Sequence, residues 1–69
     1  EPKLLEGLSN AALALSSSMD GATAKERAST ALLLRSVAAR VNAATCDWDA
    51  KVERVAAIAG AADGLEASA

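Results

Sequence analysis

The strongest helix signal lies in residues 23–41, which read TAKERASTALLLRSVAARV. The segment opens with a capping box, in which the Thr23 hydroxyl accepts a hydrogen bond from the first turn and Glu26 reaches back to the cap. Apolar residues then recur at spacings of three and four, as on one side of a helix. We therefore predict an amphipathic helix over residues 24–44, about 30 Å long. The residues predicted to share its buried side are Leu33, Leu34, Val37 and Val41.

A second helix is predicted before this segment, over residues 2–18. Pro2 suits a first helical turn, because its missing N–H would have no partner there in any case. The serines at 16–18 and Gly21 favour an end to the helix, since serine side chains compete for backbone hydrogen bonds and glycine adopts left-handed angles. The predicted buried stripe of this helix contains Leu4, Leu8 and Leu15.

A third helix is predicted over residues 48–63. Asp47 is a suitable N-cap, and Asp49 places a negative charge in the first turn, where the helix dipole favours it. Gly64 followed by Leu65 is typical of a helix C-terminus, so residues 65–69 are expected to fray. The predicted core positions of this helix are Trp48, Val52, Val55 and Ile58.

Together these segments predict an all-α fold, an up-down-up three-helix bundle that forms one domain over residues 1–69. The composition agrees, because nineteen alanines and nine leucines in 69 residues are typical of long helices. One alternative stays open. If residues 42–47 remain helical, the second and third helices merge into one long helix.

Charge and hydropathy exclude two classes of partner. Seven basic and nine acidic residues give a net charge of −2, and the basic residues are scattered, so we expect no nucleic-acid binding. No apolar run approaches the ~20 residues of a membrane span. The chain is expected to have no transmembrane segment of its own, although contact with a membrane complex stays open.

The residues that carry most enzyme chemistry are missing. The sequence contains no histidine, which excludes Ser-His-Asp and Cys-His arrangements. Asp47, Asp49 and Glu53 form an acidic group, but they lack the alternating oxygen ligands of a calcium loop and fit a solvated helix turn. We therefore expect no catalytic residue, no metal and no cofactor, and a protein that is not an enzyme.

The single cysteine and the first residue each leave alternatives. Cys46 has no partner for an internal disulfide, so it is expected to be a packing residue, with an intermolecular disulfide or a reactive thiol as alternatives. The chain begins with Glu1 and not with methionine. This suggests a processed protein of an organelle or an exported compartment, a trimmed chain, or part of a longer one.

The apolar content suggests that the protein works through association. Sixteen large apolar side chains are few for ordering 69 residues, so the isolated bundle should be marginally stable and completed by a partner. We predict a non-enzymatic helical protein–protein interaction module, favouring an accessory or structural subunit of a multiprotein complex over a homodimer. A dimerising docking segment of a multimodular synthase and a self-associating coiled-coil scaffold are the alternatives. The candidate partner contacts, outside the predicted core, are Leu5, Leu13 and Leu32.

Overall fold

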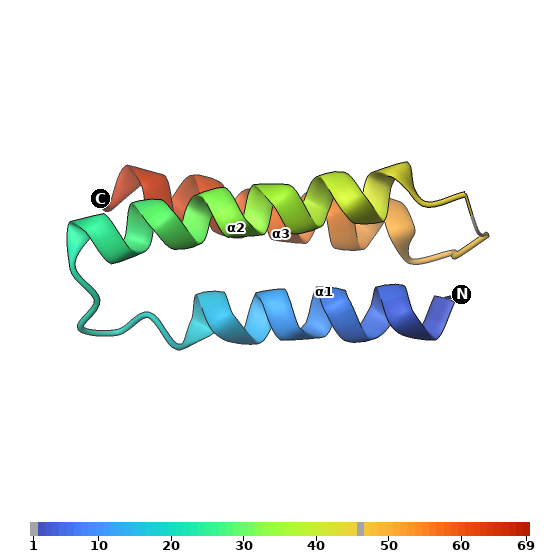
Figure 1. Ribbon diagram of the computed structural model, residues 1–69, viewed down its shortest axis with the longest axis horizontal. Helices are drawn as coiled ribbons and strands as arrows, with labels where there is room; N and C mark the ends of the chain where they lie inside the picture. The colour runs from blue at the N-terminus through green and yellow to red at the C-terminus, as the bar shows by residue number, and fades with distance from the viewer. Residues whose placement is uncertain (1, 46) are drawn as a thin grey trace.

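The computed structural model describes residues 2–45 and 47–69, which form the helices α1 (Pro2–Ser17), α2 (Ala24–Ala43) and α3 (Lys51–Ala67). Successive helices run in opposite directions and make an elongated bundle of 37 × 16 × 15 Å (Figure 1). The predicted all-α three-helix bundle is thus confirmed. Because α2 and α3 pack side by side, the alternative of one merged helix is wrong. The predictions for Cys46 lie outside the described residues.

The start of α2 has the predicted capping box. The Glu26 N–H donates to the Thr23 hydroxyl at 3.1 Å, and the Thr23 N–H donates to Glu26 Oε1 at 2.8 Å. The hydrogen bond from the Thr23 backbone N–H, and then hydrogen bonding of the Thr23 side chain with the carboxyl, lower the pKa of Glu26. Upstream, Gly21 has a φ of +79°, an angle that glycine adopts without strain, and this reverses the chain between α1 and α2.

The third helix begins three residues later than predicted. Its N-cap is Ala50, which makes no side-chain capping bond, so the assignment of Asp47 as N-cap was wrong. A different set of bonds shapes this connection. The Lys51 ammonium donates to the Ala44 carbonyl at 2.6 Å, and the Lys51 N–H donates to the Trp48 carbonyl at 3.0 Å. Trp48 therefore lies before the helix, half-buried.

The same helix also ends later than predicted, at Ala67, because it passes through Gly64 without a break. The predicted fraying of residues 65–69 was therefore wrong for the first three of them. Two arginines of α2 contact this last stretch: Arg35 contacts Glu66, and Arg27 donates to the Ser68 carbonyl at 3.2 Å. These contacts tie the end of α3 to α2.

The core lies mainly between α2 and α3 and is built from a few large side chains set among alanines. Alanine lets two helices approach closely, which suits a bundle with so few bulky residues. The buried cluster contains Ala31, Leu34 and Ala38 of α2, Ile58 and Ala62 of α3, and Ala12 of α1. Val41, further along α2, is also fully buried, while Val37 and Val55 are half-buried.

Five residues predicted for the core are exposed instead: Leu4, Leu8, Leu15, Leu33 and Val52. Val52 is 80% exposed because it lies about 120° around α3 from the buried Ile58. Leu33 is adjacent to the buried Leu34, so the helical turn of 100° per residue carries it out of the α2–α3 contact. The three leucines of α1 have a separate cause.

Helix α1 packs on the α2–α3 pair through a face of small residues. Leu5, Ser9, Ala12 and Ser16 follow one another at helical spacing, and Ser9 is fully buried. Its hydroxyl donates to the Leu5 carbonyl at 2.8 Å, which satisfies the buried polar group. Leu13 packs against the core, so the prediction that it lies outside the core was wrong, whereas Leu5 is half-buried and is not part of the core cluster. The leucine stripe of α1 consequently faces outward.

Candidate interaction surface

An apolar groove runs between α1 and α2. It measures about 220 Å³, and every residue that lines it is apolar. The lining residues are Leu8, Ala11, Ala12 and Leu15 from α1 and Leu33, Leu34 and Val37 from α2. On the α1 side, Ala11 and Ala12 line the groove between the two leucines, and their methyl groups occupy less space than larger side chains would. We call this hollow and its rim the leucine groove.

The rim of the leucine groove exposes large apolar side chains. Leu8 and Leu15 are 36% and 37% exposed, and Leu33 across from them is 52% exposed. Leu4 lies one turn before Leu8 on the same side of α1 and is 73% exposed. Single exposed leucines are ordinary on protein surfaces, but a set of them beside an apolar hollow makes this the candidate interaction surface.

Charged residues mark the two ends of the α2 rim. Glu26 lies seven residues before Leu33 and Arg40 lies seven residues after it, so all three share one side of the helix. Both charged residues are exposed. Between them, Ser29 and Ser36 flank Leu33 with small side chains. The α2 rim therefore carries a negative end, an apolar centre and a positive end.

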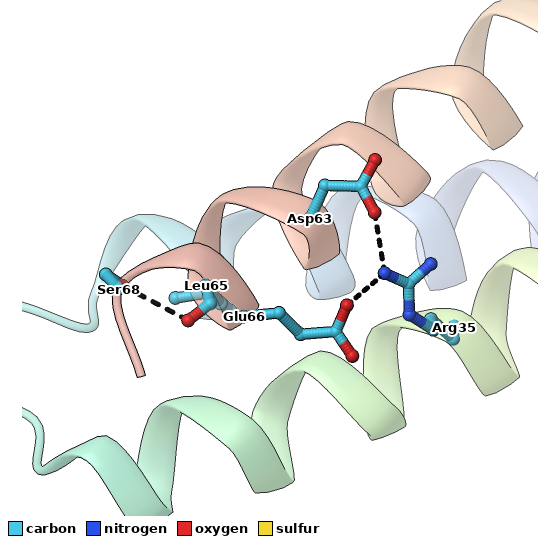
Figure 2. A network of polar contacts seen from close by, with 5 residues as sticks. All are labelled: Arg35, Asp63, Leu65, Glu66 and Ser68. Carbon is cyan, nitrogen blue, oxygen red and sulfur yellow. Dashed lines mark hydrogen bonds and ion pairs between the residues drawn. The ribbon is translucent and has the colours of Figure 1, made fainter.

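The main polar cluster lies on another side of the bundle, between α2 and α3. Figure 2 shows the Arg35 guanidinium between two acidic residues of α3, Asp63 at 2.6 Å and Glu66. The hydrogen bond to Glu66 and then that to Asp63 raise the pKa of Arg35, so the guanidinium stays charged. Its partners are 44–70% exposed and belong to the chain itself. This cluster holds two helices together, and its three charged groups bind one another.

A second hollow lies at the connection between α1 and α2. It is lined by residues of the turn and of the first part of α2, among them Asp20, Lys25 and Glu26. All of these lining side chains are exposed or half-buried, and the hollow is wide open to solvent. It lacks the enclosing apolar walls of a small-molecule pocket.

The remaining exposed apolar residues stand alone. Leu32 is 66% exposed, but it lies on α2 about 100° away from Leu33 and outside the groove. Val52, on α3, is not among the residues that line the groove either. Of the three predicted partner contacts, Leu5 and Leu13 are half-buried and Leu32 is exposed away from the leucine groove.

Over residues 2–45 and 47–69, no three acidic side chains gather in a way that could hold a metal ion. None of the three described helices has the length and hydropathy needed to cross a membrane.

Comparisons with known proteins do not assign this chain to a family. No protein family, curated protein sequence or solved structure shows a significant match to this chain. The interaction surface therefore has to be interpreted from its own geometry.

The sequence contains one signal for this surface that was missed. Two stripes of α1 have helical spacing: the leucines at 4, 8 and 15, and the set Leu5, Ser9, Ala12 and Ser16. Hydrophobicity favours burial of the first stripe, while close helix packing favours the second. The sequences of α2 and α3 are rich in alanine, so a third helix can pack closely on them only through small residues. This favours the stripe Leu5, Ser9, Ala12 and Ser16 as the buried side of α1.

Proposed function

We propose that this protein is a non-enzymatic helical protein–protein interaction module and that the leucine groove is its contact surface. The observation that carries the proposal is the orientation of α1, which buries serine and alanine and leaves three leucines beside an apolar hollow. Removing apolar surface from water contributes about 25 cal/mol per Å², and the bundle by itself leaves part of the surface of these leucines exposed.

The shape of the groove suits one kind of partner structure. It lies along two antiparallel helices, so an amphipathic helix laid parallel to them can place apolar residues at every turn into the hollow and onto its rim. An accessory or structural subunit, whose groove is covered within a larger assembly, and a docking or scaffold segment would both use this surface.

A photo-crosslinking experiment tests the proposal. A photoreactive amino acid placed at Leu33 in cells that express the protein should give discrete adducts with a defined polypeptide. The same group placed at Val52, which is also exposed but outside the groove, should give none. Masses of the adducts identify the partner. Equal labelling from both positions, or no adduct at Leu33, would contradict the proposal.

A further inference from the structure

We infer that the chain that covers the leucine groove is a second copy of this protein, related to the first by a two-fold axis that passes by Leu33. The inference rests on the proposed function, because it names the partner of the same groove. It is carried by the order of charges along α2 and by the apolar surface beside them.

The charges on the α2 rim of one copy are complementary to those of a second copy that runs in the opposite direction. Glu26 and Arg40 lie at equal distances, seven residues each, on the two sides of Leu33. An antiparallel copy of α2 centred on Leu33 therefore brings Glu26 of each copy to Arg40 of the other, twice in one dimer. Such self-complementarity is the requirement of a two-fold, isologous interface. A parallel arrangement would place like charges together at both ends.

Small side chains on the same side of α2 favour close contact. Ser29 and Ser36 lie between the charged residues and Leu33, and both are exposed. Small residues at these positions let two antiparallel helices approach until the central leucines meet. The Glu26 carboxylate is available for this pairing because the cap uses Oε1 and leaves its other oxygen.

The same two-fold rotation also brings α1 of the two copies together near its C-terminal end. The axis lies in the plane of contact and runs perpendicular to the helices, so it places α2 against α2 and α1 against α1, and both pairs are antiparallel. Because α1 and α2 are themselves antiparallel and line one groove, Leu15 lies across from Leu33, close to the axis. Leu15 of one copy therefore approaches Leu15 of the other, whereas Leu4 and Leu8 lie further from the axis.

The molecule is large enough to form an interface of standard size. A standard stable interface removes about 800 Å² from each partner. The chain exposes 4310 Å² in all, so this is a little under a fifth of its surface. A body of 37 × 16 × 15 Å has four long sides, and one of them presents an area of this order.

The first test is the mass of the protein in solution, measured by sedimentation equilibrium. The wild-type chain should be a dimer at micromolar concentration. Leu33→Asp, which places two carboxylates at the axis, should raise the dimer dissociation constant about tenfold or more. The matched control Leu32→Asp alters a neighbour that is exposed outside the groove and should leave the dimer intact. Circular dichroism establishes that both variants are folded.

A charge-swap mixture tests the two-fold arrangement itself. Glu26→Lys and Arg40→Glu each create two like-charged contacts in their own homodimers, so each should dimerise about three- to tenfold more weakly than wild type. When the two variants are mixed, every cross-contact is again between opposite charges. Native mass spectrometry should then show more heterodimer than the statistical half. A statistical mixture would contradict the two-fold pairing even if both variants dimerise.

The outcomes also separate this inference from the proposed function. In one outcome, the wild-type chain stays monomeric at high concentration and the adducts at position 33 contain a different polypeptide. This result contradicts a second copy as the partner but leaves the proposed interaction module standing. Absence of any adduct specific to position 33 contradicts both. Adducts of two identical chains, together with the heterodimer preference, support both.

Discussion

The pair of helices α2 and α3 and the single helix α1 are held in place by different means. Between α2 and α3, large and small side chains alternate, Leu34 and Ile58 are fully buried, and Arg35 binds two acidic residues across the contact (Figure 2). Helix α1 contributes two fully or nearly fully buried residues, Ser9 and Ala12, and both are small.

The difference shows that the helix with the clearest leucine stripe is not the one that forms the core. Helix α1 lies beside the α2–α3 pair (Figure 1), and its contacts with either helix are fewer than those between α2 and α3. One polar contact adds to them, in which Arg54 of α3 donates to the Asn10 side chain. The pair thus serves as the scaffold, and α1 presents leucines to the outside.

The largest expected effect concerns the scaffold. Leu34→Ala removes a fully buried side chain, and large-to-small changes of this kind cost ~2–5 kcal/mol, which is a large share of the stability of so small a domain. The variant should melt at a much lower temperature, as followed by circular dichroism. Leu32→Ala is the matched control on the same helix and should change stability by less than ~0.5 kcal/mol. Equal effects would contradict the assignment of the core.

The next effect concerns the close approach of α1. Ala12→Leu adds bulk where α1 meets the core, and overpacking typically costs ~1–3 kcal/mol. The expected result is faster amide hydrogen exchange throughout α1, with little change in α2 and α3. Ala14→Leu makes the same substitution at an exposed position of the same helix and should leave exchange unchanged. Protection of α1 equal to wild type in Ala12→Leu would show that the small-residue face is not the packing face.

A smaller effect is expected at the polar cluster between α2 and α3. Arg35→Ala removes both ion pairs with Asp63 and Glu66, which are partly exposed and therefore screened by salt. The melting temperature should fall by a few degrees at low salt and by less at high salt. Lys25→Ala, an exposed cation of the same helix, serves as the control. A loss that does not depend on salt would contradict the electrostatic role of Arg35.

The smallest effect is a pH dependence at the start of α2. The folded-state pKa of Glu26 lies below its ordinary value of 4.5, so its stabilising effect is fully present above that value. It should be lost as the pH falls through the lowered pKa. Glu26→Gln keeps a capping partner but cannot titrate, so its acid unfolding curve should be shallower. Glu6→Gln controls for the loss of one negative charge, and identical curves for Glu26→Gln and wild type would contradict this effect.

The capping box shows what the sequence could predict. Thr23 and Glu26 place the start of α2 correctly because their hydrogen bonds are local and involve residues three apart. The ends of α3 were placed wrongly because long-range contacts decide them. Lys51 bonds to a carbonyl seven residues away, and the last turn of α3 contacts arginines of α2. No local rule contains that information.

The sequence pattern within α1 also could not predict which side of this helix is buried. Helical spacing identifies stripes but does not choose between them, and Leu8 and Ser9 belong to competing stripes. The choice depends on how closely α2 and α3 approach each other and on what space remains for a third helix. For the same reason the surface formed by Leu8, Leu15 and Leu33 became visible only in three dimensions.

The accessibility of α1 tests the central claim most directly, and thiol labelling measures it. In a Cys46→Ser background, single cysteines at Ser9 and at Leu15 are compared by their rates of reaction with a water-soluble maleimide. At high dilution the Leu15→Cys thiol should react rapidly and the Ser9→Cys thiol slowly. At concentrations where the chain is associated, the thiol at position 15 should become protected. A thiol at position 9 that reacts faster than one at position 15 would show that the leucine stripe is the buried face, contrary to this account.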